Sequence, residues 1–159
     1  KSWGDRGSAP GQFNTVHGIG ADAQGNIYTA DRSNRRIQVF DPNGGPVRII
    51  TIDVPYTKEP NVMLGAMPRQ NSNALSVNGA PWAICITPRP NQVLYAADAF
   101  PGRIYKLSLD GKVLGWLGQS GKQLKQFGWI HELACPSENE IYAAELLNWR
   151  AQKLMLHPK

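Results

Sequence analysis

The fold follows from residues 26–40, which read NIYTADRSNRRIQVF. Two runs rich in isoleucine, tyrosine, threonine and valine flank the polar stretch Arg32–Arg35. Such runs on either side of a turn are typical of a β-hairpin. The pattern returns twice further along the chain, as Val93–Asp98 with Arg103–Leu107 and as Glu140–Glu145 with Arg150–Leu154. The sequence is therefore a repeat array, and each repeat is one small sheet.

Each repeat contains more than the hairpin. A β-rich run precedes each copy, beginning at His17, Trp82 and His131, and a fourth run follows the first two copies at Pro46–Ile50 and Lys112–Trp116. Four antiparallel strands make one blade of a β-propeller. We therefore expect an all-β chain of three four-stranded blades at about 14–52, 80–118 and 128–157. The spacing from Tyr28 to Tyr95 exceeds that from Tyr95 to Tyr142 by 20 residues, which predicts an insertion within 53–79.

Several phrases carry a family resemblance. In Gly11–Phe13 and Lys125–Phe127 a phenylalanine stands four residues before a histidine, and these phrases, with Asn26–Tyr28 and Arg36–Phe40, resemble NHL repeats. The resemblance implies an NHL-type β-propeller, usually six-bladed, of which three blades are one half. It does not imply one activity, because such propellers serve as enzymes, as protein-binding modules and as RNA-binding modules.

Two histidines occupy one repeat position. His17 and His131 each stand 14 residues before an acidic residue, Asp31 or Glu145, and Trp82 takes their place in the middle repeat. Histidines in alternate blades resemble the peptidylglycine amidating lyase family, which implies a role as zinc ligands. We therefore expect His17 and His131 to hold a metal, zinc or calcium. The alternative is that each histidine caps its strand and hydrogen-bonds a loop.

Candidate ligand-binding residues follow the second strand of each repeat. They are Arg32, Asn34, Phe100, Asn148 and Trp149. Connections in a meander alternate between two faces, so we expect these residues on the same face as the histidines and the insertion. The lyase resemblance implies that Arg32 binds an anionic substrate; the alternative is an exposed loop arginine. That family uses a tyrosine where this chain has Phe100, and a phenyl ring cannot transfer a proton.

Other charged residues and the cysteines have a structural interpretation. An arginine follows the acidic residue by five positions in every repeat, in the pairs Asp31/Arg36, Asp98/Arg103 and Glu145/Arg150. A pair in every repeat indicates scaffold, since catalysis needs one site. Cys85 and Cys135 lie in apolar runs, so we expect buried free thiols.

The charge and hydropathy of the chain limit its partners. The net charge of +5 is spread out, with Arg35–Arg36 the longest basic cluster, which argues against nucleic acid as the partner. No apolar stretch approaches the ~20 residues that cross a bilayer, so no membrane span is predicted. The family resemblance favours a secreted or periplasmic location.

Three functions remain as hypotheses. The first is a propeller that binds a peptide, a protein or a small anionic ligand on its loop-rich face, with possible metal dependence and lyase-like activity. The second is a non-enzymatic protein or peptide interaction module, and the third is an RNA-binding propeller. Three blades cannot close a ring, and the third repeat lacks a fourth run, while Ser2–Gly4 resembles the end of one. This predicts a homodimer or the remainder of a longer propeller as a partner.

Overall fold

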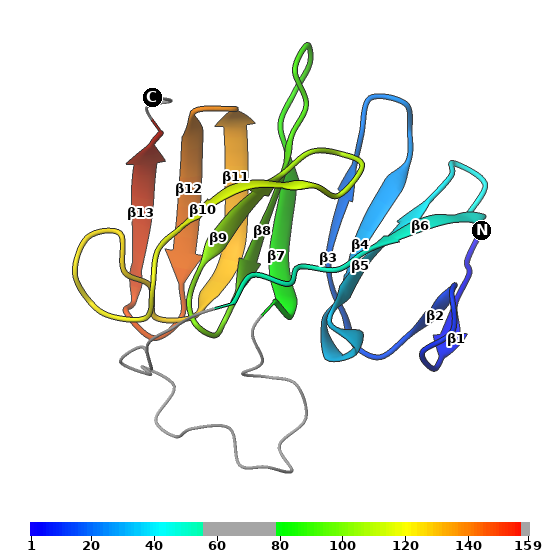
Figure 1. The fold of residues 1–159 in the computed structure, drawn as a ribbon, viewed down its shortest axis with the longest axis horizontal. Helices are drawn as coiled ribbons and strands as arrows, with labels where there is room; N and C mark the ends of the chain where they lie inside the picture. The colour runs from blue at the N-terminus through cyan, green and yellow to red at the C-terminus, as the bar shows by residue number, and fades with distance from the viewer. Residues whose placement is uncertain (56–78, 157–159) are drawn as a thin grey trace.

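The computed structural model describes residues 1–55 and 79–156. In this part of the chain the regular structure is β-strand, apart from one 3₁₀ turn, η1 (Arg32–Asn34). Apart from the parallel pair β1 (Asp5–Arg6) and β2 (Gln12–Phe13), the strands form three antiparallel sheets that stand side by side as blades, from the first at the right of Figure 1 to the third at the left. The predicted all-β propeller fold is confirmed. Residues 56–78 of the predicted insertion lie outside the described residues.

The first two blades have four strands each, connected in sequence order. The first contains β3 (Val16–Ala21), β4 (Ile27–Asp31), β5 (Arg36–Phe40) and β6 (Pro46–Ile50). The second contains β7 (Pro81–Ile86), β8 (Leu94–Asp98), β9 (Ile104–Leu107) and β10 (Val113–Leu117).

The third blade has three strands among the described residues. These are β11 (Ile130–Ser137), β12 (Glu140–Glu145) and β13 (Arg150–Met155). Within residues 79–156, β13 pairs only with β12, so its outer edge has no strand partner there.

The first strands of the blades, β3, β7 and β11, lie next to one another (Figure 1). Gly18 permits the close approach of β3 to β7, because a Cβ atom at Gly18 would lie 3.0 Å from the carbonyl oxygen of Trp82. This approach brings the beginnings of the three strands, and their side chains, to one place.

Two apolar layers fill the spaces between the blades. The layer between the first and second blades includes Tyr28, Ala30 and Ile84. The layer between the second and third includes Tyr95, Ala97 and Leu133. The tyrosine and alanine of the first and second blades therefore pack against the blade that follows, and this burial is the main stabilising contribution to the array.

A loop before the first blade is fixed by an arginine from β5. This loop contains the short parallel strands β1 (Asp5–Arg6) and β2 (Gln12–Phe13). Arg36 donates from Nε to Asp31 at 2.8 Å and from its terminal nitrogens to the backbone oxygens of Ser8, Ala9 and Gln12.

The loop before the third blade repeats the arrangement. Arg150 donates to Glu145 at 2.7 Å and to the backbone oxygens of Lys122, Gln123 and Gln126. The scaffold role predicted for these acidic–arginine pairs is confirmed in the first and third blades. In the second blade, Asp98 accepts from the Tyr105 hydroxyl, and Arg103 donates to the Val54 and Pro55 carbonyls.

The expectation of free thiols was wrong. Cys85 on β7 and Cys135 on β11 form a disulfide, with their Cα atoms 6.1 Å apart. The two first strands are neighbours, so cysteines 50 positions apart in the sequence come within bonding range. The disulfide links the second blade to the third.

Within residues 1–55 and 79–156, no helix has the length and apolar character that a membrane-spanning helix needs.

Candidate functional site

The predicted face gathers five side chains at the beginnings of the first strands. We call them the Trp82 cluster: His17 from β3, Arg32 from η1, Trp82 from β7, and Trp129 and His131 at the start of the third blade. The turn that carries Arg32 is attached to this face, since the Arg32 amide donates to the Thr15 carbonyl at 3.1 Å. Blades one, two and three each contribute to the cluster.

The two histidine rings lie next to each other and beside the Trp82 ring. Their ring centroids are 5.2 Å apart, and the His17 ring lies 4.4 Å from that of Trp82. His17 Nδ1 is 2.9 Å from the Trp82 carbonyl oxygen. A carbonyl only accepts, so Nδ1 carries the hydrogen and Nε2 keeps a lone pair.

Arg32 lies over the face of the Trp82 ring, and Trp129 meets this ring edge-on. The guanidinium carbon of Arg32 lies 4.2 Å from the Trp82 ring centroid, a cation–π contact, and the Trp129 ring lies 4.5 Å away. Arg32 Nε, Trp82 Nε1 and Trp129 Nε1 are buried and have no hydrogen-bond acceptor among the described residues. The cluster thus presents donors in excess of acceptors.

Burial changes the acid–base properties of the cluster. Burial lowers the pKa of His17 below the ordinary 6.5. The hydrogen bond to the Trp82 carbonyl opposes this shift, and the nearby His131 and Arg32 side chains lower the pKa further. Burial also lowers the pKa of Arg32. His17 is therefore neutral at pH 7 and free to act as a ligand or an acceptor through Nε2.

The structure brings some predicted site residues together and leaves others apart. His17, His131 and Arg32 share the Trp82 cluster, whereas Phe100 is buried and Trp149 is exposed. Trp149 has a positive φ of 48°, and the equivalent residue of the second blade is Gly102, with φ 80°. The binding roles of Phe100 and Trp149 stay predictions.

The two predicted asparagines form hydrogen bonds with the loops before their blades. Asn34 Nδ2 donates to the Gly7 carbonyl at 2.9 Å and to Asp31 at 2.8 Å. Asn148 Nδ2 makes the equivalent bonds, to the Gly121 carbonyl at 2.8 Å and to Glu145. Their amide groups hold the preceding loops in place, and a role in ligand binding stays a prediction.

Trp129 is a member of the cluster that sequence reasoning missed. It stands two residues before His131, as Thr15 stands before His17, and both residues have positive φ, 61° and 73°. Its equivalent position in the first blade holds a small residue, so the repeat pattern gave no signal for an aromatic side chain.

Among residues 1–55 and 79–156, no group of three or more histidine, cysteine, aspartate or glutamate side chains is arranged to hold a metal ion. His17 and His131 would provide two ligands of the three or four that a zinc site uses.

The comparisons with known proteins place the repeat in a family. Residues 13–40 match the NHL repeat. The chain is 45% identical over 42 residues to the human and the mouse NHL repeat-containing protein 3, which is 26% of this chain and 12% of each relative. The matched segment thus spans about an eighth of the relatives' length.

Solved structures agree on the fold. Hydrazine synthase of Kuenenia stuttgartiensis matches with a TM-score of 0.53 and 12% identity, over 88% of this chain and 32% of that one. The protein U3-55K matches with a TM-score of 0.51 and 11% identity, over 94% of this chain and 39% of that one. At such identities the likeness concerns the fold alone. The similarity to amidating lyases stays a prediction, and the chain is a β-propeller array in which residues 13–40 match the NHL repeat.

Proposed function

We propose that the chain binds an anionic group, the carboxylate of a peptide or of a small molecule, at the Trp82 cluster. One observation carries this proposal: Arg32 Nε, Trp82 Nε1 and Trp129 Nε1 are buried donors without an acceptor among the described residues. A buried unpaired donor costs about 1–3 kcal/mol, so a ligand that supplies acceptors would recover this free energy. Arg32 adds the positive charge that distinguishes an anion from a neutral acceptor.

The aromatic rings would define the rest of the ligand. Trp82 and Trp129 meet at an interplanar angle of 78°, which leaves apolar ring surface beside the donors. A carboxylate attached to an apolar group therefore suits the cluster better than a fully hydrated inorganic anion.

Arg32→Gln tests the anion site. We expect it to weaken binding of N-acetylglycine about tenfold or more, because a charge-assisted hydrogen bond is lost. Tryptophan fluorescence titration at constant ionic strength measures the affinity. Arg35→Gln is the matched control, since it removes the same charge from an exposed position three residues along the same loop. Equal affinities of the two variants, or failure of the unchanged protein to bind N-acetylglycine, would refute the proposal.

Metal binding is a second candidate function at the same cluster. The specific observation in its favour is the bond between His17 Nδ1 and the Trp82 carbonyl, which orients the ring and leaves Nε2 for a metal. Two imidazoles suit zinc, whereas calcium prefers oxygen ligands. No catalytic step is proposed, since Phe100 replaces the tyrosine of the amidating lyases.

Zinc titration of the three histidine variants tests this candidate. We expect His17→Gln and His131→Gln each to abolish stoichiometric Zn²⁺ binding at pH 7.5, with His157→Gln as the control. A protonated imidazole cannot bind zinc, so zinc affinity should fall at acid pH. Because the pKa of His17 is lower than 6.5, the fall should begin only below pH 6.5. Calorimetry with a competing chelator measures the affinity. Equal zinc affinity in all three variants would contradict the candidate.

RNA binding is the third candidate function. The terminal nitrogens of Arg36 and Arg150 donate to backbone oxygens of the loops, so these guanidinium groups are not available for a phosphate. The Cys85–Cys135 disulfide supports the proposal of a secreted or periplasmic location, where disulfides persist.

A further inference from the structure

We propose that the first blade packs against the third blade of a second copy of this chain. The proposal is independent of the anion site. It rests on the two blade-to-blade interfaces inside the chain, which use equivalent residues, and on the two faces at which the same residues are left uncovered.

The forward face of a blade carries a tyrosine and an alanine on its second strand. Tyr28 and Tyr95 on this face are each 1% exposed, because the next blade covers them. In the third blade the equivalent Tyr142 is 39% exposed, and Ala144 beside it is exposed as well. We call this the open face of the third blade; no described residue covers it as the next blade covers its equivalents.

The backward face of a blade carries an aliphatic residue on its first strand. Ile84 and Leu133 are 4% and 5% exposed, because they pack in the layers that contain the tyrosines and alanines of the preceding blade. The strand register identifies Ile19 as their equivalent: Ile19 pairs with Thr29, as Ile84 pairs with Ala96 and Leu133 with Ala143. Ile19 is 68% exposed.

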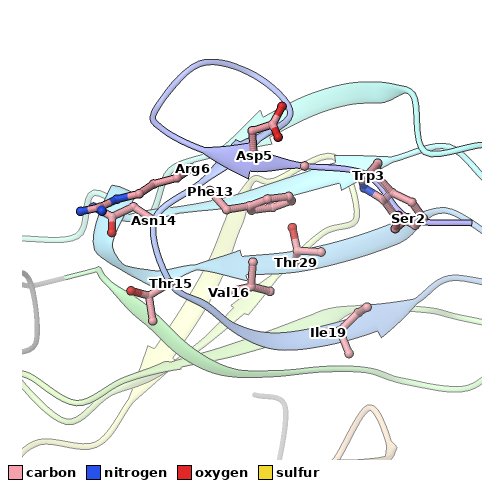
Figure 2. A pocket seen from close by; sticks show the side chains of 11 residues that line it. Ser2, Trp3, Asp5, Arg6, Phe13, Asn14, Thr15, Val16, Ile19 and Thr29 are labelled. Atoms are coloured by element: carbon pink, nitrogen blue, oxygen red, sulfur yellow. The ribbon is translucent and has the colours of Figure 1, made fainter.

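A groove surrounds Ile19. It has a volume of about 730 Å³ and runs between the segment that precedes β1 and the first strands of the blade (Figure 2). Its apolar lining comes from Trp3, Phe13, Val16 and Ile19. We call this groove, with Ile19, the open face of the first blade.

The counterpart of this groove exists in the third blade and is filled there. The loop that begins at Gly118 repeats the loop that begins at Gly4: Gly7 N donates to Phe13 O at 3.0 Å, and Gly121 N donates to Phe127 O at 3.1 Å. Phe127, Ile130 and Leu133 accordingly match Phe13, Val16 and Ile19. They pack against Ala83, Tyr95 and Ala97 of the second blade. The groove of the first blade therefore has the form that receives a tyrosine-and-alanine face.

Among surfaces formed by the described residues, the one that fits the groove is the open face of the third blade, from a second copy of the chain. This face is the one tyrosine-and-alanine face left uncovered in residues 1–55 and 79–156. It cannot reach the groove of its own chain, since the second blade stands between them (Figure 1). Two copies related by a twofold axis would fill both grooves and close a ring of six blades. In that ring the N-terminal segment of one copy would lie beside the free edge of β13 in the other.

Light scattering with a pair of charge variants tests the proposal. The unchanged chain should have twice the 17.5 kDa mass of one chain at micromolar concentration. Ile19→Lys and Ala144→Glu, each on an exposed position, should each give single chains with unchanged circular dichroism. An equimolar mixture of the two variants should recover the double mass, because every contact then joins either opposite charges or unchanged faces.

Two outcomes would overturn the proposal. One is a folded species of single-chain mass for the unchanged protein, which would leave further blades of a longer polypeptide as the occupant. The other is a double mass that both variants retain, which would place the dimer contact elsewhere on the chain.

Discussion

The chain, unfolded in urea without reductant, is expected to react with no thiol reagent, because Cys85 and Cys135 are joined. Replacing both with alanine should lower the free energy of unfolding by about 4 kcal/mol, since the disulfide closes a loop of 50 positions in the unfolded chain. Urea denaturation at one fixed protein concentration measures the difference. The expected loss is a large fraction of the stability of an ordinary domain.

The reductant itself provides the control for this first prediction. Dithiothreitol should destabilise the unchanged protein and leave the double alanine variant unaffected, which separates loss of the bond from loss of side-chain packing. Two reactive thiols per unreduced chain would show that the cysteines are free, and that non-covalent contacts alone join the second blade to the third.

The strand pattern was predictable because each repeat presents the same local signals. Alternating apolar runs and turn residues recur in Asn26–Phe40 and its two copies. Because the pattern occurs three times, one residue that departs from it in a single copy does not change the strand assignment. The disulfide was not predictable in this way. Cys85 and Cys135 each satisfy the pattern as apolar strand residues, and their closeness depends on the contact between β7 and β11, which is a property of the assembled array.

In the candidate site, too, the residues at repeat positions were predictable and the contacts between blades were not. His17 and His131 were found together because they share a repeat position, and Arg32 because its loop must lie on their face. The stack of Arg32 on Trp82 joins two blades, so nothing in either repeat indicates it. The loop resemblance predicted Asn34 as a ligand-binding residue, and its hydrogen bond to the Gly7 carbonyl has no signature in the sequence.

The last prediction concerns the buried pair that fixes the first loop. Asp31→Ala should lower the free energy of unfolding by about 3–5 kcal/mol, because it leaves the Arg36 guanidinium buried without its counter-charge. Asp31 also accepts hydrogen bonds from the Asn14 amide and from Asn34, both at 2.8 Å, and these donors would lose their acceptor. Urea denaturation at the same protein concentration measures the loss.

Two further variants give the expected order of effects. Glu145→Ala removes the equivalent carboxylate in the third blade, where the arginine side chain is 28% exposed against 10% for Arg36, so water can replace part of the lost interaction and the loss should be smaller. Glu140→Ala breaks the more exposed pair with Lys153, which water screens, and should cause the smallest loss of the three. Equal losses for Asp31→Ala and Glu140→Ala would mean that burial of the carboxylate does not determine its contribution. The fixed loop would then depend on the hydrogen bonds that Arg36, Asn34 and Gln38 donate to its backbone oxygens.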